Sequence, residues 1–477
     1  MPRLFIVIAA AVYFVFATTT VSGFGLGPLP KRLRARLSTT AAAQKGSTSS
    51  PASAVLNMSP KAYDVVVFGA TSYAGALVAE YYLKTYGASP PSFKWAVAAR
   101  SEEKLTALKK RLSAEVDTAA GSLPTIIADS MDDEAVERMV SQAKVIVTTV
   151  GPYNRYGSKL VAACARAGVH YCDLTGESLW VKEMIDKHHA EAESTGAKIV
   201  PSCGFDSIPA DMGTFLMAEH MERVYGVKPH DVRYYFMKSA GGASGGTIAT
   251  VLDVCELAWS GGKEVRRQLN DPLLLTTPAG VSTFRKVTNP GGWGYDSLGK
   301  VWTSASPFAG HDAKVVYRSA DLLGYPGLFR YKEVMGFKGL LKGLLPAMVS
   351  AFSLTVGMVF MVIPVTRRII AKKLLPSPGE GPSKEARDNG FFWINYVAKG
   401  SVDGKEVVCH GKVGSDKGDG GYKETAKMLA ECGLCLALDK EVVECKKGGI
   451  LTTAVAMGMP LIKRMNDAGM TFKVLDN

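Results

Sequence analysis

The chain has 477 residues, 47% hydrophobic and 21% charged, a composition typical of a folded protein with two domains or one large core. Its formal charge of +12 is concentrated at one end, because residues 1–63 hold seven of the 56 Lys and Arg and none of the 44 Asp and Glu. The rest of the chain is only mildly basic, which argues against nucleic acid as a partner.

The acid-free N-terminus has the order of a targeting sequence. Arg3 precedes an apolar run of 14 residues and then small residues, as in a secretory signal. A basic stretch rich in Ser, Thr and Ala begins at Phe24 and suits a transit peptide. The pair resembles the two-part plastid presequences of algae with complex plastids. We therefore expect residues 1–61 to be a disordered presequence and the protein to be membrane-associated in a plastid. The alternative is a signal anchor with a disordered stalk, on an endomembrane or lipid droplet.

From residue 62 to 225, short β-branched runs alternate with helical patterns. The expected strands are 64–68, 94–99, 125–128, 144–149, 170–174 and 197–203. The expected helices are 73–86, 102–111, 132–140, 179–193 and 208–222. This alternation predicts an α/β fold with a Rossmann-type, doubly wound parallel sheet.

A second, mixed α+β domain is expected over residues 226–420. Strand-like runs at 231–237, 313–319, 391–400 and 405–414 lack short crossover helices between them, which favours an antiparallel sheet. Residues 421–477 return to a helical pattern and are expected to pack back on the first domain.

Residues 343–366 carry no charge over 24 positions, although Lys338 and Lys342 precede them and Arg367 and Arg368 follow. This length suffices to span a membrane, yet both flanks are basic and give no orientation. We expect a helix or hairpin that dips into one leaflet. A buried core helix and a true span remain open.

The stretch "VVVFGATSYAG" runs from the first strand into a glycine-bounded turn, Gly69-x-x-Ser72-x-x-Gly75. Gly69 allows the turn, Gly75 allows the helix to approach the sheet, and the helix N–H groups from about Ser72 can bind pyrophosphate. Thr71 and Tyr73 lie in the same turn. Ser72 stands where the usual pattern has glycine, and its hydroxyl is expected to face phosphate.

The next strand ends allow a more specific assignment of the cofactor. Arg100 ends the second strand, where an arginine suits the 2′-phosphate of NADP, and Ser101 adds a hydrogen-bonding group. Asp129 follows the third strand and either meets the adenine or caps the next helix. Gly151 and Pro152 form a rigid turn after the fourth strand, beside the expected nicotinamide. The predicted cofactor is NADP(H).

Candidates for catalysis and substrate binding follow the later strands. Tyr153 is the candidate proton donor, with packing as its alternative. The candidate substrate-binding residues are Asp173, Thr175, Glu177, Asp206, Ser207 and Ser244. Asp206 and Ser207 have helix capping as an alternative, and Ser244 lies in a glycine-rich loop that precedes an apolar helix. No metal site is expected.

Several motifs occur in the order found in the saccharopine dehydrogenase-like oxidoreductases. They are "GATSYAG", "GPYNRYG", "YCDLTGE", "CGFDSIPAD", "GGASGGT" and "GGYKETAKMLAECGLCLA". The chain resembles this family over about residues 62–477, most closely its lipid-associated branch and the bacterial trans-acting enoyl reductases. The resemblance implies a Rossmann domain that binds NADP(H), and a second domain that dimerises or holds substrate. Ser72 departs from the family's glycine.

Two functions remain after the sequence has been considered. The first is an NADP-dependent oxidoreductase that reduces a C=C, C=O or C=N bond in a small-molecule or lipid-linked substrate at a membrane or lipid-droplet surface. The second is a lipid-surface protein whose NADP site is structural or sensory and does not turn over.

Overall fold

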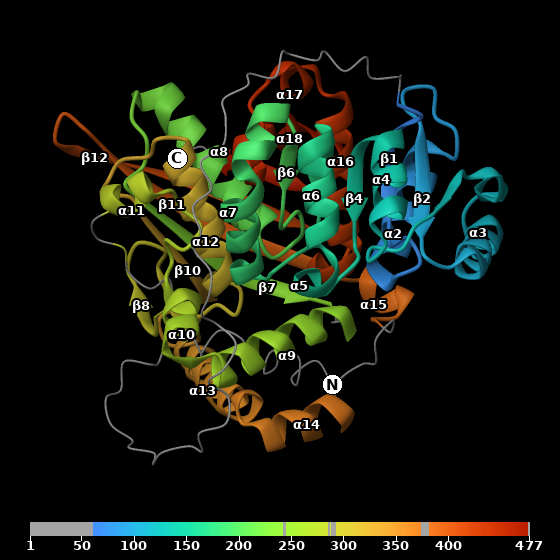
Figure 1. Ribbon diagram of the computed structural model, residues 1–477. Helices are drawn as coiled ribbons and strands as arrows, with labels where there is room; N and C mark the ends of the chain where they lie inside the picture. The colour runs from blue at the N-terminus through green and yellow to red at the C-terminus, as the bar shows by residue number, and fades with distance from the viewer. Residues whose placement is uncertain (1–60, 242–244, 285–286, 288–291, 374–380, 476–477) are drawn as a thin grey trace, which may run out of the picture.

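A computed structural model describes residues 61–241, 245–284, 287, 292–373 and 381–475. The expected presequence, apart from residue 61, and Ser244 therefore lie outside the described residues. Two seven-stranded sheets organise the chain, the first at the right of Figure 1 and the second at the left.

The first sheet is parallel, with the strand order β13-β6-β5-β4-β1-β2-β3. Its strands are β1 Tyr63–Phe68, β2 Trp95–Ala99, β3 Thr125–Ile127, β4 Ala143–Thr148, β5 His170–Cys172, β6 Lys198–Val200 and β13 Gly449–Ile450. The predicted Rossmann-type sheet is confirmed, and the C-terminal region adds β13, which the sequence did not predict.

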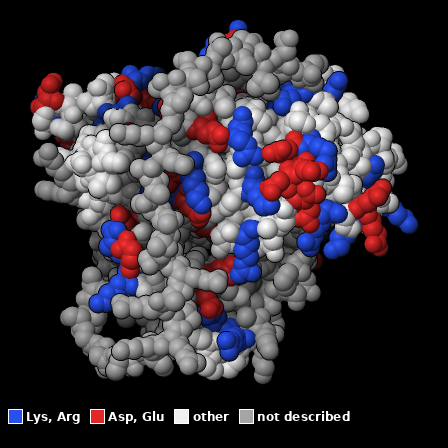
Figure 2. All heavy atoms as spheres, in the orientation of Figure 1, with Lys and Arg blue, Asp and Glu red and all other residues white. Residues whose placement is uncertain are grey.

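Helices cover both faces of this sheet because successive side chains of each strand point to opposite faces and are apolar on both. Val65 and Val67 belong to a core with helices α2 and α3, whereas Val66 and Phe68 face α4, α6 and α7. The helix bounds are α2 Tyr73–Tyr86, α3 Glu102–Glu115, α4 Asp133–Gln142, α5 Tyr153–Tyr156, α6 Ser158–Ala167, α7 Ser178–Thr195 and α8 Ile208–Tyr225. A short 3-10 helix, Thr118–Ser122, follows α3. Figure 2 shows acidic and basic side chains interspersed over these outer helices.

The C-terminal region returns to the first sheet. Its helices are α16 Thr425–Leu438, α17 Lys440–Glu444 and α18 Thr453–Asp467, and a π-helical turn, Gly420–Glu424, leads into them. Tyr82 donates its hydroxyl hydrogen bond to the carbonyl of Ala430 at 2.7 Å. A Cβ on Gly433 would lie 2.5 Å from a methyl group of Val147, so α16 packs directly on the sheet.

The second sheet has the order β14-β12-β11-β7-β10-β9-β8. Its strands are β7 Asp231–Ala240, β8 Gly294–Asp296, β9 Val301–Ala305, β10 Arg330–Lys338, β11 Phe391–Val402, β12 Lys405–Ser415 and β14 Thr471–Leu475. Because β7 and β10 pair in parallel and the other pairs are antiparallel, the sheet is mixed, and the expectation of an antiparallel sheet is corrected.

One expected strand of this domain is wrong. Residues 313–319 belong to helix α12, Ala309–Leu322, which is buried on all sides from Asp312 to Ala320. A helix with no solvent face has no polar stripe, so its β-branched run resembled a strand. Its two cations are satisfied by carbonyl groups, since Lys314 donates to Leu269 O at 2.9 Å and Arg318 to Leu275 O at 2.6 Å.

The uncharged residues 343–366 form one helix and the start of a second. Helix α13, Leu344–Val362, ends at Ile363, and α14, Pro364–Lys373, begins with a proline. The remaining helices of this domain are α9 Gly245–Ser260, α10 Gly262–Asn270, α11 Pro278–Thr283 and α15 Lys384–Asp388. By length and composition alone, α13 could cross a membrane. It is not a core helix, because Leu345 is 67% and Phe352 71% exposed.

Candidate functional site

The turn after β1 has the close approach that a dinucleotide cradle needs. Gly69 has φ +81°, a conformation that favours glycine. A Cβ on Gly75 would lie 2.2 Å from the carbonyl oxygen of Gly69, so no side chain fits there. Among the described residues, no backbone acceptor pairs with the N–H groups of Tyr73 and Ala74 at the start of α2. This geometry fits a pyrophosphate held at the N-terminus of α2.

Ser72 keeps the cradle intact by a different route from glycine. Its φ of −74° is open to any residue, so glycine is not required there. Its hydroxyl accepts a hydrogen bond from Gly75 N at 3.0 Å and lies 2.9 Å from the hydroxyl of Thr149, which donates to Gly69 O. The expected role of this hydroxyl toward phosphate is corrected, because it caps α2 and joins the turn to the end of β4.

On the adenine side of the cradle, Arg100 is the residue with a free charged group. Arg100 directly follows the last residue of β2 and is exposed to solvent. No carboxylate pairs with it in the described part of the chain. Ser101 caps α3 by accepting from Lys104 N at 3.2 Å. Asp129 accepts from Met131 N at 2.9 Å, and the cap of α4 is Asp132 instead. Arg100 thus remains available for the 2′-phosphate.

A segment of the second domain closes over the cradle, which the sequence did not suggest. Tyr73 donates to Pro382 O at 2.6 Å and accepts from Arg387 Nη1 at 2.7 Å. A Cβ on Gly381 would lie 2.3 Å from the Tyr73 ring. Figure 1 shows α15, which carries Arg387, beside the start of α2. The phosphate end of the cradle is therefore bordered by a cation from the other domain.

The loop after β4 is held by a buried carboxylate. Glu177 accepts from Tyr153 N at 2.7 Å and Asn154 N at 2.8 Å, and burial raises its pKa. The Tyr153 hydroxyl donates to Thr148 O at 3.3 Å and accepts from Leu174 N at 3.1 Å. The hydroxyl of this buried phenol therefore donates and accepts its hydrogen bonds within the protein, and burial raises its pKa. This geometry does not favour Tyr153 as proton donor. Gly151 and Pro152 lead into this loop as expected.

Asp173 and Thr175 belong to an interior network rather than to a substrate surface. Asp173 accepts from Tyr171 OH at 2.6 Å and from the N–H groups of Thr175 and Ser202, both at 2.9 Å. Burial raises its pKa to about 7. Thr175 accepts from Glu177 N at 3.1 Å. These residues position the loops after β5 and β6, which corrects their expected contact with substrate.

Helix α12 begins between the two sheets and contributes a histidine that sequence analysis missed. His311 Nδ1 lies 2.7 Å from Ser178 Oγ, and its Nε2 lies 2.9 Å from Ser202 Oγ. Because Ser202 donates to Thr175 O, it accepts from Nε2–H, and Ser178 donates to Nδ1. Burial lowers the pKa of His311 to about 3, so the ring is neutral. The pattern of residues 309–322 gave no sign of this placement.

Three carboxyl groups gather on the other side of α12. Asp312 accepts from Ser207 Oγ at 2.9 Å, and Glu333 accepts from Ser306 Oγ and Tyr331 OH. Ser207 is the N-cap residue of α8, but the alternative of capping by its side chain is wrong, because its hydroxyl donates to Asp312 and makes no cap bond. Asp206 is exposed at the surface of this loop, yet the protein atoms crowded around its carboxyl partly exclude water and raise its pKa to about 6. It is the carboxyl of this group that a ligand can reach.

The mouth of this region connects to the apolar helices. Arg155, in the loop after β4, pairs with Asp253 of α9 at 3.3 Å. A small apolar cluster joins α9 to α13 and α14 through Cys255, Met358 and Met361. Figure 1 shows these three helices at the end of the molecule where α5 and α15 lie.

The chain is similar to known proteins over most of its length. The family described as "Saccharopine dehydrogenase NADP binding domain" matches residues 65–200. A trans-acting enoyl reductase from Mycobacterium tuberculosis is 33% identical over 426 residues, covering 86% of this chain and 98% of its own length. A second protein of that organism, named provisionally for the same activity, is 35% identical over 428 residues, covering 88% of this chain and 99% of its own.

Solved structures resemble the chain at a greater distance. Apo saccharopine dehydrogenase from Saccharomyces cerevisiae aligns with 87% of this chain and 100% of its own at 12% identity, with a TM-score of 0.48. The amine dehydrogenase from Mycobacterium smegmatis aligns with 83% of this chain and 95% of its own at 15% identity, with a TM-score of 0.41.

Proposed function

The chain belongs to the saccharopine dehydrogenase-like family of NADP-binding oxidoreductases, and on that premise we propose that it reduces a carbon–carbon double bond in a lipid-linked substrate with NADPH. The names of its relatives favour an enoyl group over a carbonyl or imine. The observation that carries the proposal is the approach of α2 to the turn after β1, where even a methyl group on Gly75 would clash.

The chain's own residues bind and orient the cofactor in this proposal. The N–H groups at the start of α2 hold the pyrophosphate, and Arg100 pairs with the 2′-phosphate. Arg387, which donates to the hydroxyl of Tyr73 at the start of α2, would add a positive charge near the bound phosphates. When bound, NADPH supplies the hydride.

Asp206 is the proposed proton source. Reduction of an activated double bond requires a proton on the carbon next to the activating carbonyl, and a carboxyl with a raised pKa delivers it efficiently near neutral pH. Asp206 reaches solvent in the loop after β6, and its pKa is about 6. The other candidates are occupied: Tyr153 bonds within its own loop, and Asp173 accepts three hydrogen bonds.

The lipid part of the proposal rests on α13 and α14. Phe352, Val359 and Phe360 of α13 are 47% to 71% exposed, and Val365 and Ile369 extend this apolar surface along α14. Soluble proteins rarely expose a patch of this kind. Basic residues flank it at both ends, which fits insertion into one anionic leaflet rather than a span. A small apolar cluster packs α13 and α14 on α9, and α9 is in turn paired with the loop after β4 through Asp253 and Arg155.

We further propose that residues 1–61 direct the protein through the secretory route to a plastid and are then removed. N-terminal sequencing of native protein is expected to begin near residue 62. A start near Met1 would favour an uncleaved anchor on an endomembrane or lipid droplet.

Incubation with NADPH and matched lipids that carry an enone, a ketone or an imine tests the chemistry. We expect oxidation of NADPH with the enone lipid and recovery of its saturated product. Binding of NADPH without oxidation by any of the three would contradict the enzymatic function and favour a structural or sensory site.

A further inference from the structure

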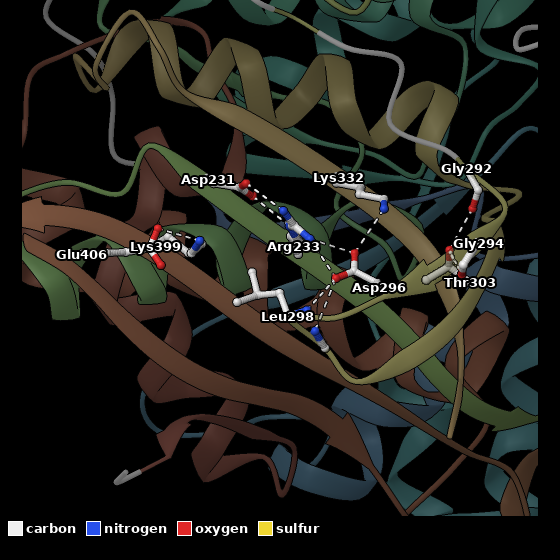
Figure 3. Close-up of polar contacts among 11 residues, drawn as sticks. Asp231, Arg233, Gly292, Gly294, Asp296, Leu298, Thr303, Lys332, Lys399 and Glu406 are labelled. Carbon is white, nitrogen blue, oxygen red and sulfur yellow. Dashed lines mark hydrogen bonds and ion pairs between the residues drawn. The ribbon is translucent and has the colours of Figure 1, made fainter. Parts of the chain in front are cut away.

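The outer face of the second sheet carries cations of two kinds. At one end, Arg233 pairs with Asp296 at 2.7 Å and with Asp231 at 3.2 Å, and Lys332 pairs with Asp296 at 3.1 Å. Lys399 pairs with Glu406 at 2.6 Å. Figure 3 shows this network across neighbouring strands. The positive charges at this end are therefore neutralised by the protein itself.

The opposite end of the same strands borders a cavity of about 530 Å³ whose cations are not neutralised. Lys238, Lys338, Lys342 and Lys412 line it from β7, β10, the approach to α13, and β12. In the described part of the chain, no carboxylate lies within ion-pair distance of any of the four. Four ammonium groups left without counterions around one cavity favour an anionic occupant.

An aromatic ring forms part of the cavity wall. A Cβ on Gly414 would lie 2.3 Å from the Trp393 ring, so this ring lies against the strand beside it. Lys412 Nζ stands 3.6 Å from the centre of the ring. Asp416, the one carboxylate among the described residues that line the cavity, accepts from Trp393 Nε1 at 2.7 Å. The indole and Asp416 thus hold each other, and the lysines outnumber the acid four to one.

The N-terminus of α13 opens on the same cavity. Gly343 is the N-cap of this 19-residue helix and Pro346 lies in its first turn, and both line the cavity. Among the residues that the structure describes, no side chain caps this end and no acidic residue lies in its first turn, so nothing there compensates the positive end of the helix dipole. Leu341 and Leu345, which are 83% and 67% exposed, are the chain neighbours of the lining residues Lys342 and Pro346.

We propose that this cavity binds the phosphate-bearing headgroup of a membrane lipid. This inference rests on the membrane attachment in the proposed function and adds a site to it. Lysines without counterions and an open helix N-terminus suit a phosphate. The exposed leucines next to these lining residues distinguish a lipid from free phosphate, because acyl chains would continue from the headgroup along the apolar face of α13. The cavity volume is within the range of small-molecule sites.

Co-sedimentation with phosphatidylcholine vesicles, with and without phosphatidylglycerol, tests this site in the full chain. The variant is Lys338→Gln/Lys342→Gln/Lys412→Gln. The matched control is Lys104→Gln/Lys446→Gln/Lys447→Gln, which removes the same charge from α3 and the segment after α17, far from α13 in Figure 1. Wild type and control should bind phosphatidylglycerol vesicles more tightly than phosphatidylcholine. The cavity variant should lose roughly tenfold or more of that gain, at about 1 kcal/mol per surface lysine.

The outcomes separate this site from the membrane attachment itself. An equal loss in the control would show general charge attraction and overturn the site. If the cavity variant kept the full preference for phosphatidylglycerol vesicles, the proposed site would also be overturned, but the membrane attachment would not. Inorganic phosphate is the soluble arm, and its saturable binding to wild type without any effect on vesicle binding would assign the cavity to free phosphate instead. Wild-type protein that ignores both kinds of vesicle would contradict the attachment, and the headgroup site with it.

Discussion

The cofactor cradle and the basic cavity beside α13 differ in how far apart their parts lie along the chain. Gly69, Ser72 and Gly75 fall within seven residues, and their geometry follows from one turn between a strand and a helix. The basic cavity instead draws on four strands and on the start of α13, between residues 237 and 416. Local steric rules decide the cradle, whereas the cavity exists only after a mixed sheet has assembled in one register.

The substitution with the largest expected effect on the cofactor cradle replaces Gly75 by alanine, which has the smallest side chain. Gly75→Ala places a Cβ 2.2 Å from Gly69 O, so α2 must move away from the turn. We expect NADPH affinity to fall more than about 100-fold, because the phosphate-binding N–H groups move with the helix. Gly121→Ala is the control, since its Cβ meets its nearest atom at 3.6 Å. Unchanged NADPH titration in Gly75→Ala would place the cofactor elsewhere.

Asp206 is the proposed proton source, and its substitution should affect chemistry rather than binding. Asp206→Asn is expected to lower kcat by about 10²- to 10⁴-fold with little change in NADPH affinity. Asp133→Asn on the exposed start of α4 is the control.

The pH dependence follows from the raised pKa of Asp206. The carboxyl is protonated below about pH 6, so kcat should be flat at lower pH and fall as pH rises through 6. Because the folded pKa lies above the ordinary value of 3.8, this group also favours the folded state at low pH, and that contribution is lost as pH rises through 6. A pH profile that is the same in wild type and Asp206→Asn would remove the assignment.

Substitution of Arg100 in the cofactor cradle should have an intermediate effect, which appears in the preference for NADPH over NADH. Arg100→Ala should weaken NADPH by about 1.5–3 kcal/mol, the range for a charge-assisted hydrogen bond, and leave NADH unchanged. Titration of both cofactors, with Arg111→Ala as a control on the exposed face of α3, measures the difference. Equal losses for NADPH and NADH would show that Arg100 does not contact the 2′-phosphate.

Ser72→Gly should have the smallest effect. The structure makes this hydroxyl a helix cap, and replacement of a capping serine by glycine costs only a few tenths of a kcal/mol. Melting temperature and NADPH affinity should therefore stay close to wild type, within about tenfold for affinity. A larger loss of NADPH affinity would show that the hydroxyl contacts phosphate after all.

The sequence predicted the elements whose signals are local. All six expected strands of the first sheet occur, because each is a short run rich in apolar or β-branched residues and a turn or loop follows it. Helix α12 was misread because complete burial removed its polar face, and His311 was missed with it. The closure of Arg387 over Tyr73 joins residues 314 positions apart, and no local pattern records such a contact.

Reduction of a membrane-borne substrate is the central claim. Its most direct test is the rate of NADPH oxidation with an enoyl lipid in vesicles, compared between wild type and Leu345→Glu/Phe352→Glu. Both side chains are exposed on α13, so the variant should fold. We predict that the variant loses at least about tenfold of the rate with vesicles, because two charges oppose insertion, and keeps its rate with a short soluble enoyl thioester. Equal rates with vesicles would contradict substrate delivery from the membrane.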